Sequence, residues 1–308
     1  MKKFILLLTV CLLSLFTKSQ LLADESPSGN KDIKESKVFF KPTTLNKERR
    51  INFYVMTIEK SNKIDYTTIS VRIRAAIRGF LDRKKLYVIV VKSSEEAARR
   101  IAGIVLQKGK MIDNIWFDSH GHYKNRFSSF RVGKDIFSFK NIRDTHATKY
   151  LKYISHYCDN NTKIALGACY AGADFYFPAT DSTPATRMNG DSLMMGMGNI
   201  FKESTIYASE SWVMAKPGIF ANKYGFAGYP IVKKSKDIIF EPVWKRIGKW
   251  RQYKYGTGLI ENISTVSMDR AGNINIKKRD FNLMDKTQKK IAIKLKKLKP
   301  GLAYNKKP

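Results

Sequence analysis

The sequence alternates short apolar runs with amphipathic segments, and this alternation sets the fold class. Five runs are rich in β-branched and aromatic residues, which favours strands. They lie at 51–58, 86–91, 112–118, 162–168 and 204–211. Helical spacing of apolar residues predicts helices over 67–82, 93–107, 144–158 and 191–202. Strands that alternate with helices form βαβ units, so we predict an α/β fold with a mostly parallel sheet that helices cover on both faces.

Three of the predicted helices begin at residues that suit a helix N-cap. Ser93 or Ser94 precedes the helix that ends near residue 107, and Asp144 or Thr145 precedes the next one. Asp191 has the same position before the helix that follows it. Side-chain oxygens at these positions accept hydrogen bonds from the first free N–H groups of a helix, so the caps are predicted together with the helices.

The regular pattern divides the chain into five regions. Residues 127–140 predict a hairpin around Gly133-Lys134, and 173–190 form a long loop, a feature typical of a lid over a site. The part after residue 213 is less regular, with a helix predicted near 237–251 and a hairpin at 259–277. The five predicted regions follow one another along the chain. They are a signal peptide (1–23), a polar linker or pro-segment (24–48), the main domain (49–215), its C-terminal part or a small accessory region (216–276), and a Lys-rich tail (277–308).

The first 23 residues have the pattern of a secretory signal. Lys2 and Lys3 form a basic start, and the apolar stretch 4–16 is too short for a membrane span of about 20 residues. Cleavage is expected after Ala23 or after Ser19, with an uncleaved N-terminal anchor as the alternative. We therefore expect a secreted, periplasmic or cell-envelope protein.

Charge and cysteine content limit the classes of function. The chain carries 57 Lys and Arg against 26 Asp and Glu, a formal charge of +31, which favours contact with anionic surfaces. The Lys-rich tail alone holds 12 basic and 2 acidic residues, and apolar residues between 291 and 298 predict an amphipathic helix in it. Three cysteines exclude a disulfide scaffold and a Cys-rich zinc module, and four histidines leave little room for a metal site. No cofactor and no specific nucleic acid are predicted.

Two strand ends carry reactive side chains beside glycine. The predicted strand 112–118 is followed by His120-Gly121-His122, and the strand 162–168 is followed by Cys169. Adjacent parallel strands bring such ends together. A cysteine peptidase needs a thiolate that attacks a carbonyl, an imidazole that moves the proton, and backbone N–H groups that bind the oxyanion. The two strand ends supply these groups.

His-Gly after one strand and Ala-Cys after the next resemble the caspase-like cysteine peptidases, the clan of caspases, legumains, gingipains and clostripain. The resemblance covers roughly residues 50–215 and implies a caspase-like three-layer α/β/α sandwich, here with a basic C-terminal extension. It implies that His120 is the general base and acid, that Cys169 is the nucleophile, and that the N–H groups of Gly121 and Cys169 form the oxyanion hole. Gly167 and Tyr170 replace the polar neighbours of the caspase signature, so no caspase-type preference for aspartate is expected.

The substrate-binding residues are predicted on the segments that flank this site. The resemblance implies that the stretch from Ser209, Glu210 and Trp212 onward pairs with an extended substrate. Glu210, Asp174 or Asp191 would bind a basic substrate side chain, although each also fits an ordinary surface carboxylate.

Three further roles stay open at the level of sequence. His122 is the rival base and otherwise lines the site. Cys158 is expected to be a buried thiol at a helix end, with a Cys158–Cys169 disulfide as the alternative. A metal at His120 and His122 lacks a third ligand.

The sequence thus predicts an exported cysteine endopeptidase that hydrolyses protein or peptide substrates through an acyl-enzyme. Two other classes remain. One is an inactive protein of the same fold that binds a peptide or partner. The other is a cationic protein whose charge binds an anionic envelope or nucleic acid, and the Lys-rich tail is the segment expected to make that contact.

Overall fold

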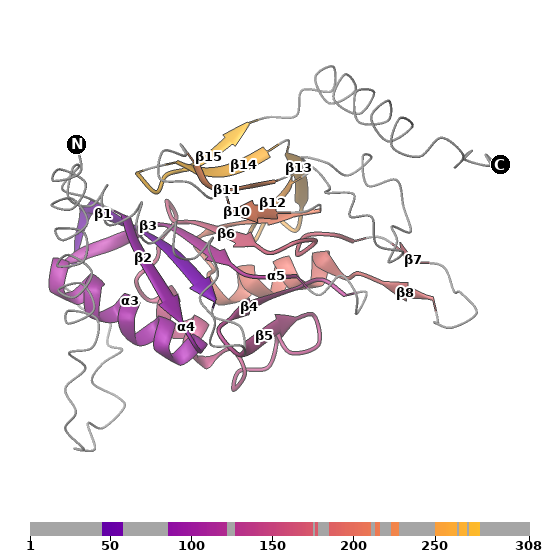
Figure 1. The fold of residues 1–308 in the computed structure, drawn as a ribbon, viewed down its shortest axis with the longest axis horizontal. Coiled ribbons are helices and arrows are strands. Elements are labelled where there is room, and N and C mark those ends of the chain that lie inside the picture. The colour runs from indigo at the N-terminus through magenta and orange to yellow at the C-terminus, as the bar shows by residue number, and fades with distance from the viewer. Residues whose placement is uncertain are drawn as a thin grey trace, which may run out of the picture. The chain divides into compact units, whose positions relative to one another are not determined.

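In the part of the chain that the structure describes, the central sheet has seven strands in the order β13-β12-β9-β6-β3-β1-β2 (Figure 1). The computed structural model describes residues 45–57, 86–121, 127–174, 176–177, 185–210, 213–215, 223–227, 250–263, 265–269 and 271–277. The strands of this sheet are β1 (Asn46–Thr57), β2 (Leu86–Val91), β3 (Lys110–Asp118), β6 (Lys163–Gly167), β9 (Thr205–Ser209), β12 (Trp250–Lys254) and β13 (Ile260–Ile263).

The five strands predicted from the apolar runs are confirmed and lie parallel to one another. β1 pairs with β2 and β3, β3 pairs with β6, and β6 pairs with β9, all in parallel. β12 adds to β9 in the antiparallel direction, and β13 continues the sheet from β12. The protein is therefore α/β with a mostly parallel mixed sheet, and β3 and β6 lie next to each other in its middle.

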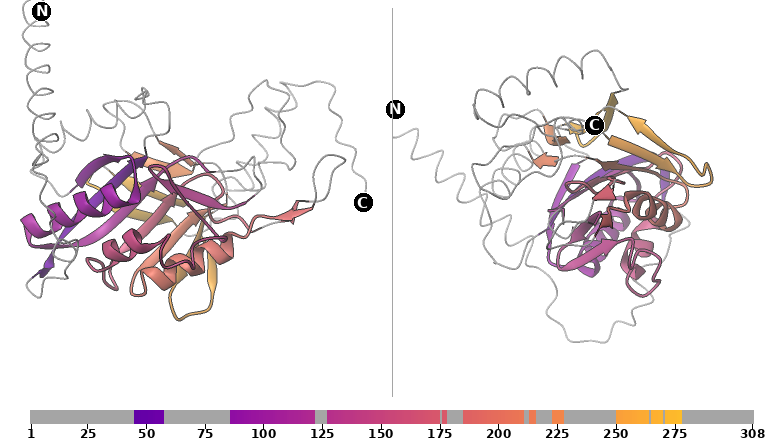
Figure 2. Two further views of the ribbon diagram at one scale, coloured as in Figure 1. Left: turned by 90° about the horizontal axis from the view of Figure 1, so that it is seen from below. Right: turned by 90° about the vertical axis from the view of Figure 1, so that its right-hand side faces the viewer.

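The described helices lie on one face of this sheet (Figures 1 and 2). They are α3 (Ser94–Lys108), α4 (Lys149–Ser155) and α5 (Gly190–Ile200). In α3, Ala97, Ile101 and Val105 recur at helical spacing and are fully buried against the sheet. Burial of such apolar surface contributes about 25 cal/mol per Å², which holds the helix on the sheet.

Among the described residues, a second sheet packs on the opposite face, where the sequence also predicted helices. It consists of β10 (Val213–Ala215), β11 (Lys223–Ala227), β14 (Thr265–Asp269) and β15 (Ile274–Lys277), in that order. Val266, Met268 and Ile274 pack there against Trp116 and Trp250 of the central sheet. The predicted hairpin at 259–277 is thus only partly correct: β14 and β15 pair with each other, while β13 joins the central sheet.

Two small hairpins complete the described fold. The hairpin predicted at 127–140 is confirmed as β4 (Ser129–Val132) and β5 (Asp135–Ser138). Within the long loop 173–190, β7 (Tyr176–Phe177) pairs with β8 (Thr186–Arg187). None of the helices in the described residues is long and apolar enough to cross a lipid bilayer.

Of the three predicted helix caps, one is confirmed and two differ from the structure. Ser93 caps α3 and accepts from the N–H of Glu96, as predicted, but α4 starts only at Lys149. Asp144 accepts instead from the N–H of His146 within a turn, so its oxygen is used before the helix begins. The cap position of α5 is Asn189, which leaves Asp191 in the first turn.

The predicted helix near 237–251 is wrong at its end, where residues 250 and 251 belong to β12, and its earlier part lies outside the described residues. Several other predictions also lie outside the described residues. They concern the signal peptide, most of the linker, the helix at 67–82, His122, Trp212 and the tail from residue 278 onward.

Candidate active site

The two predicted strand ends lie side by side. β3 and β6 are paired in parallel up to Asp118 and Gly167, so the residues that follow leave the sheet at the same edge. His120 and Gly121 follow β3, and Cys169 follows β6. The carboxyl ends of neighbouring parallel strands are the usual place for a site in an α/β sheet.

Gly121 lies directly against the backbone of Cys169. A Cβ atom added at Gly121 would lie 1.9 Å from the carbonyl oxygen of Cys169 and 3.0 Å from its nitrogen. A residue with a side chain cannot approach another backbone this closely. The glycine therefore permits the contact between the two loops that the sequence predicted.

The sulfur of Cys169 lies beside the backbone of Val213. Its Sγ accepts a hydrogen bond from the N–H of Val213 at 3.4 Å and lies 3.6 Å from the carbonyl oxygen of the same residue. The N–H groups of Gly121 and of Cys169 itself also favour the thiolate and lower the pKa of the thiol. These last two are the N–H groups that the resemblance implies for the oxyanion hole.

Burial raises the pKa of the Cys169 thiol above its ordinary value, and the negative charge of Asp118 adds to this. The three N–H groups favour the thiolate and lower the pKa, but they do not outweigh burial. The thiol is consequently neutral at pH 7 in this conformation. It needs a base, or a change in its surroundings, to become a nucleophile.

His120 is exposed, and within the described part of the chain its ring forms no hydrogen bond with the sulfur. The structure thus joins the His-Gly and Cys loops through Gly121, while no hydrogen bond joins the imidazole to the thiol. Cys158 and Cys169 are both free, which excludes a disulfide between them in this structure. Cys158 is buried after α4, as predicted, and burial raises the pKa of its thiol strongly.

A strained turn holds Cys169 in place. Tyr170 has φ of 61°, a left-handed backbone that side chains disfavour, and its own side chain is buried. The hydroxyl of Ser128 lies 2.8 Å from the carbonyl oxygen of Tyr170 and 2.7 Å from that of Ala173. The N–H of Gly172 donates to the carbonyl oxygen of Ser209 at 2.9 Å. These bonds tie both sides of the turn to the fold, and sequence reasoning missed Ser128 because its partners are backbone atoms far along the chain.

The three candidate carboxylates belong to one network of ion pairs. Asp174 binds Arg187 through two hydrogen bonds of 2.9 and 2.6 Å. Arg251 binds Asp191, the carbonyl oxygen of Gly172 at 3.0 Å and Glu210 at 3.8 Å. Arg251 comes from β12, and no local sequence pattern connects it to the site.

Asp174 and Asp191 interact with each other, and their pKa values move in opposite directions. Burial raises the pKa of both carboxyls. For Asp174 the hydrogen bonds and charge of Arg187 outweigh burial, so its pKa lies below the ordinary range. For Asp191 the negative charge of Asp174 adds to burial, and its pKa is raised although Arg251 opposes this. Titratable groups with perturbed pKa values next to a reactive residue are typical of functional sites.

The remaining predicted residues have simpler surroundings. The side chain of Ser209 is fully buried, and its carbonyl oxygen contributes to the turn. No group of three or more His, Cys, Asp and Glu residues suited to a metal ion occurs among the described residues. No protein-family model matches the sequence, and a comparison with curated proteins finds no significant match.

Proposed function

We propose that the protein is an exported cysteine endopeptidase with a caspase-like arrangement of its site, in which Cys169 attacks and His120 moves the proton. The observation that carries this proposal is the position of Gly121 against the backbone of Cys169, where the N–H groups of both residues favour the thiolate. A substrate carbonyl placed next to Sγ would meet these same two donors. The adjacent strand ends and the order of histidine before cysteine support the same assignment.

The chemistry follows from these groups. The His120 imidazole takes the thiol proton as Sγ attacks the substrate carbonyl carbon, and the N–H groups of Gly121 and Cys169 bind the negative oxygen. The protonated imidazole then gives its proton to the leaving amine, which breaks the peptide bond and leaves an acyl-enzyme. Water, deprotonated by the same imidazole, hydrolyses the thioester and restores the thiol.

This reaction requires a rearrangement from the described conformation. The exposed His120 ring must turn toward the sulfur, and the contact between Sγ and Val213 must give way to the substrate. We propose that Ser209, Glu210 and Trp212 border the substrate, and that Asp174 and Glu210 attract a basic side chain, with His122 at the edge of the site. Arg187 and Arg251 neutralise much of the acidic charge, so such a side chain would have to compete with them.

The test combines labelling with matched substitutions. Incubation with a peptide acyloxymethylketone library, followed by mass spectrometry, should modify Cys169 and leave Cys158 unmodified. Cys169→Ala and His120→Ala should each lower kcat/KM by a factor on the order of 10³ or more. Cys158→Ala and His146→Ala, which remove the same side chains elsewhere, should change it little. A larger loss with His122→Ala than with His120→Ala would reassign the base.

A second candidate is an inactive protein of the same arrangement that binds peptides. The neutral thiol, its contact with Val213 and the exposed His120 favour it. In that case a peptide would bind the wild-type protein with an affinity that Cys169→Ala leaves unchanged, and no cleavage product or acyl-enzyme would form.

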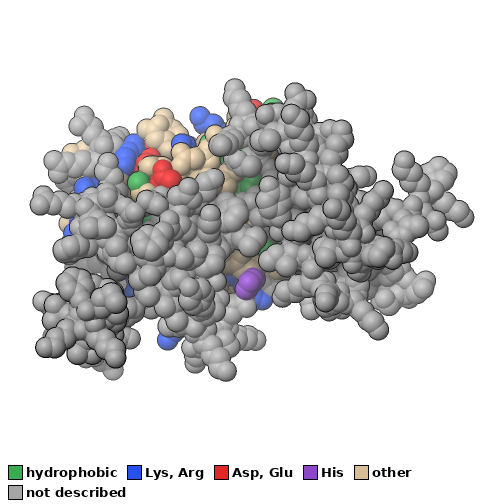
Figure 3. Space-filling view, turned by 45° about the horizontal axis from the view of Figure 1, so that its top comes forward, with side chains coloured by type: hydrophobic (Ala, Val, Ile, Leu, Met, Phe, Trp, Pro, Cys, Tyr) green, Lys and Arg blue, Asp and Glu red, His purple; other side chains and the backbone are tan. Residues whose placement is uncertain are grey.

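The basic charge is a separate proposal about location. Lys and Arg side chains appear at several places on the described surface, beside a smaller acidic group, so the positive charge is not confined to the tail (Figure 3). We propose that the signal sequence exports the protein and that the tail from residue 277 holds it on an anionic envelope surface.

A further inference from the structure

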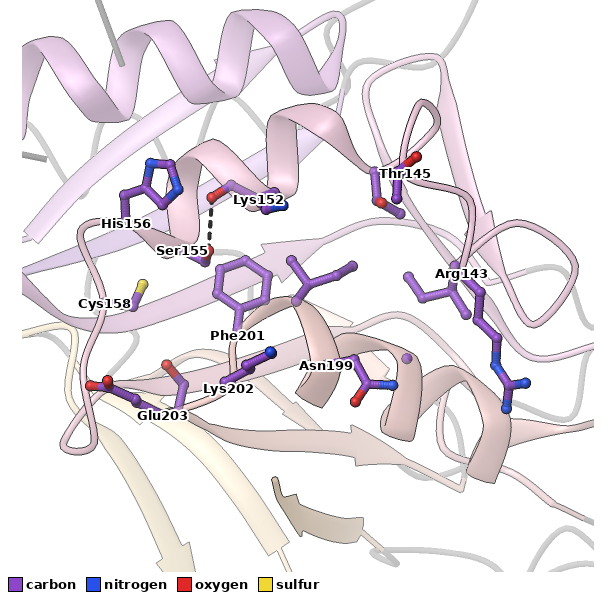
Figure 4. A pocket seen from close by; sticks show the side chains of 15 residues that line it. Arg143, Thr145, Lys152, Ser155, His156, Cys158, Asn199, Phe201, Lys202 and Glu203 are labelled. Atoms are coloured by element: carbon purple, nitrogen blue, oxygen red, sulfur yellow. Dashed lines mark hydrogen bonds between the residues drawn. The ribbon is translucent and has the colours of Figure 1, made fainter. Parts of the chain in front are cut away.

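A cavity of about 660 Å³ lies between α4 and the C-terminal half of α5 (Figure 4). It belongs to the opposite end of the sheet from Cys169. Its lining residues Cys158 and Ser204 come just before β6 and β9, whereas Cys169 follows the carboxyl end of β6. The five residues of β6, at about 3.3 Å each, separate the two places by roughly 16 Å. The cavity is therefore separate from the candidate active site.

The floor of the cavity is apolar. Ile142 and Phe201 line it and are 2% and 1% exposed, and the buried Cys158 lies beside them. Figure 4 shows the Phe201 ring between the two helices, with Cys158 next to it. Small-molecule sites typically measure about 300–1,000 Å³ and are lined mainly by such side chains. The size and floor suit a compact apolar group.

The rim of the cavity is cationic. Lys152 comes from α4, Lys202 follows α5, and Arg143 comes from the turn before α4, all with exposed side chains. Glu203 is the acidic lining residue. Within the described part of the chain none of the three cations forms an ion pair, although Lys202 lies 5.7 Å from the ring of Tyr255. An anionic group at the mouth would thus find cations that no described carboxylate has already paired.

We propose that this cavity binds a small amphipathic anion, a molecule with a compact apolar body and one anionic head such as a carboxylate or phosphate. The apolar body would pack against the partly exposed Ile200 above the buried floor, and the head would pair with Lys152 and Lys202. An inorganic anion would leave the apolar lining at Ile200 exposed to water, and a neutral apolar molecule would leave the rim cations unpaired. The two halves of the site therefore select for both properties in one ligand.

The test is a titration of the full-length protein with decanoate, decyl phosphate, decanol and inorganic phosphate at about 0.15 M salt, where long-range attraction is screened. Calorimetry should show saturable one-to-one binding of decanoate or decyl phosphate, at least tenfold tighter than decanol and inorganic phosphate. The better of the two heads identifies the ligand class. Equal binding of decanol, or equal binding of inorganic phosphate, would overturn the proposal.

Matched variants locate the binding. Lys152→Glu/Lys202→Glu should weaken it at least tenfold, and Asn199→Trp, which places an indole at the exposed mouth on α5, should abolish it. Lys108→Glu/Lys134→Glu changes the net charge equally at exposed positions outside the cavity and should leave binding within twofold. Thermal unfolding would confirm that each variant is folded. Equal weakening by the two charge pairs would show that the +31 net charge, and not the cavity, attracts the ligand.

Discussion

Gly121→Ala is the substitution that most directly tests how the site is built. Its Cβ would lie 1.9 Å from the carbonyl oxygen of Cys169, and ordinary van der Waals contact begins at 3.4 Å. The two loops must therefore separate by about 1.5 Å, because both contacting groups are backbone and neither can rotate away. The substitution adds one methyl group but moves the proposed oxyanion donor, the N–H of Gly121, relative to the proposed nucleophile, Cys169.

The expected magnitude follows from that displacement. A misplacement of about 1 Å costs roughly 10²-fold in rate, and loss of one oxyanion donor costs about 10²–10³-fold. We therefore expect kcat/KM of Gly121→Ala on a peptide substrate to fall by about 10²–10³. Overpacking should also lower the free energy of unfolding by about 1–3 kcal/mol.

Gly103→Ala is the matched control for this substitution. Gly103 lies within α3, and a Cβ there meets nothing within 4 Å. Alanine is favoured over glycine in a helix by about 1 kcal/mol, so this variant should be slightly more stable and equally active. Steady-state turnover and urea unfolding of both variants give the comparison. If Gly121→Ala keeps the activity and stability of Gly103→Ala, the proposed contact between the loops is wrong.

Three further predictions concern acid stability, thiol reactivity and the tail. Burial raises the pKa of Asp159, but its hydrogen bonds and ion pair with Arg50 hold it below the ordinary value. The ion pair therefore stabilises the fold at pH values above the ordinary aspartate pKa of about 4. This stability is lost as the pH falls through the lowered pKa of the folded protein. Asp159→Asn should lower the free energy of unfolding by about 1–3 kcal/mol at pH 7, and urea titrations should show the gap closing below pH 4. Iodoacetamide should modify Cys169 slowly at pH 7, and the rate should continue to rise above pH ~8.5, where the rate for an ordinary thiol levels off. Cys158 should react only when the protein unfolds. Fast alkylation of Cys169 at neutral pH would contradict its raised pKa. A chain that ends at Ile276 should keep its turnover of a neutral peptide but lose co-sedimentation with anionic vesicles at low salt, and equal binding by both chains would assign the charge effect to the folded part.

The elements that the sequence predicted well are those with a local cause. The strand runs are apolar and β-branched, and Ser93 needs only the N–H of Glu96 to cap α3. The juxtaposition of His120-Gly121 with Cys169 was also predictable, because parallel pairing of consecutive strands brings their ends together.

The features that sequence reasoning missed depend on distant partners. Val213 contacts the sulfur from a strand 44 residues further on, and Arg251 reaches Asp191 from 60 residues away. The helix expected up to residue 251 fails because Trp250 is fully buried as part of β12, a tertiary effect that helical spacing cannot show. The exposure of the His120 ring is likewise set by the loop conformation, about which the motif carries no information.

The last two strands of the central sheet also determine when the protein can finish folding. β12 pairs with β9 along five residues, from Thr205 to Ser209, and β13 follows it. Until residues 250–263 have been synthesised and have joined the sheet, β9 presents an open edge able to pair with another chain. A polypeptide cut after residue 215 would keep His120 and Cys169 but would have this edge exposed permanently. Self-association, rather than loss of a proposed catalytic group, is the outcome to expect from such a fragment.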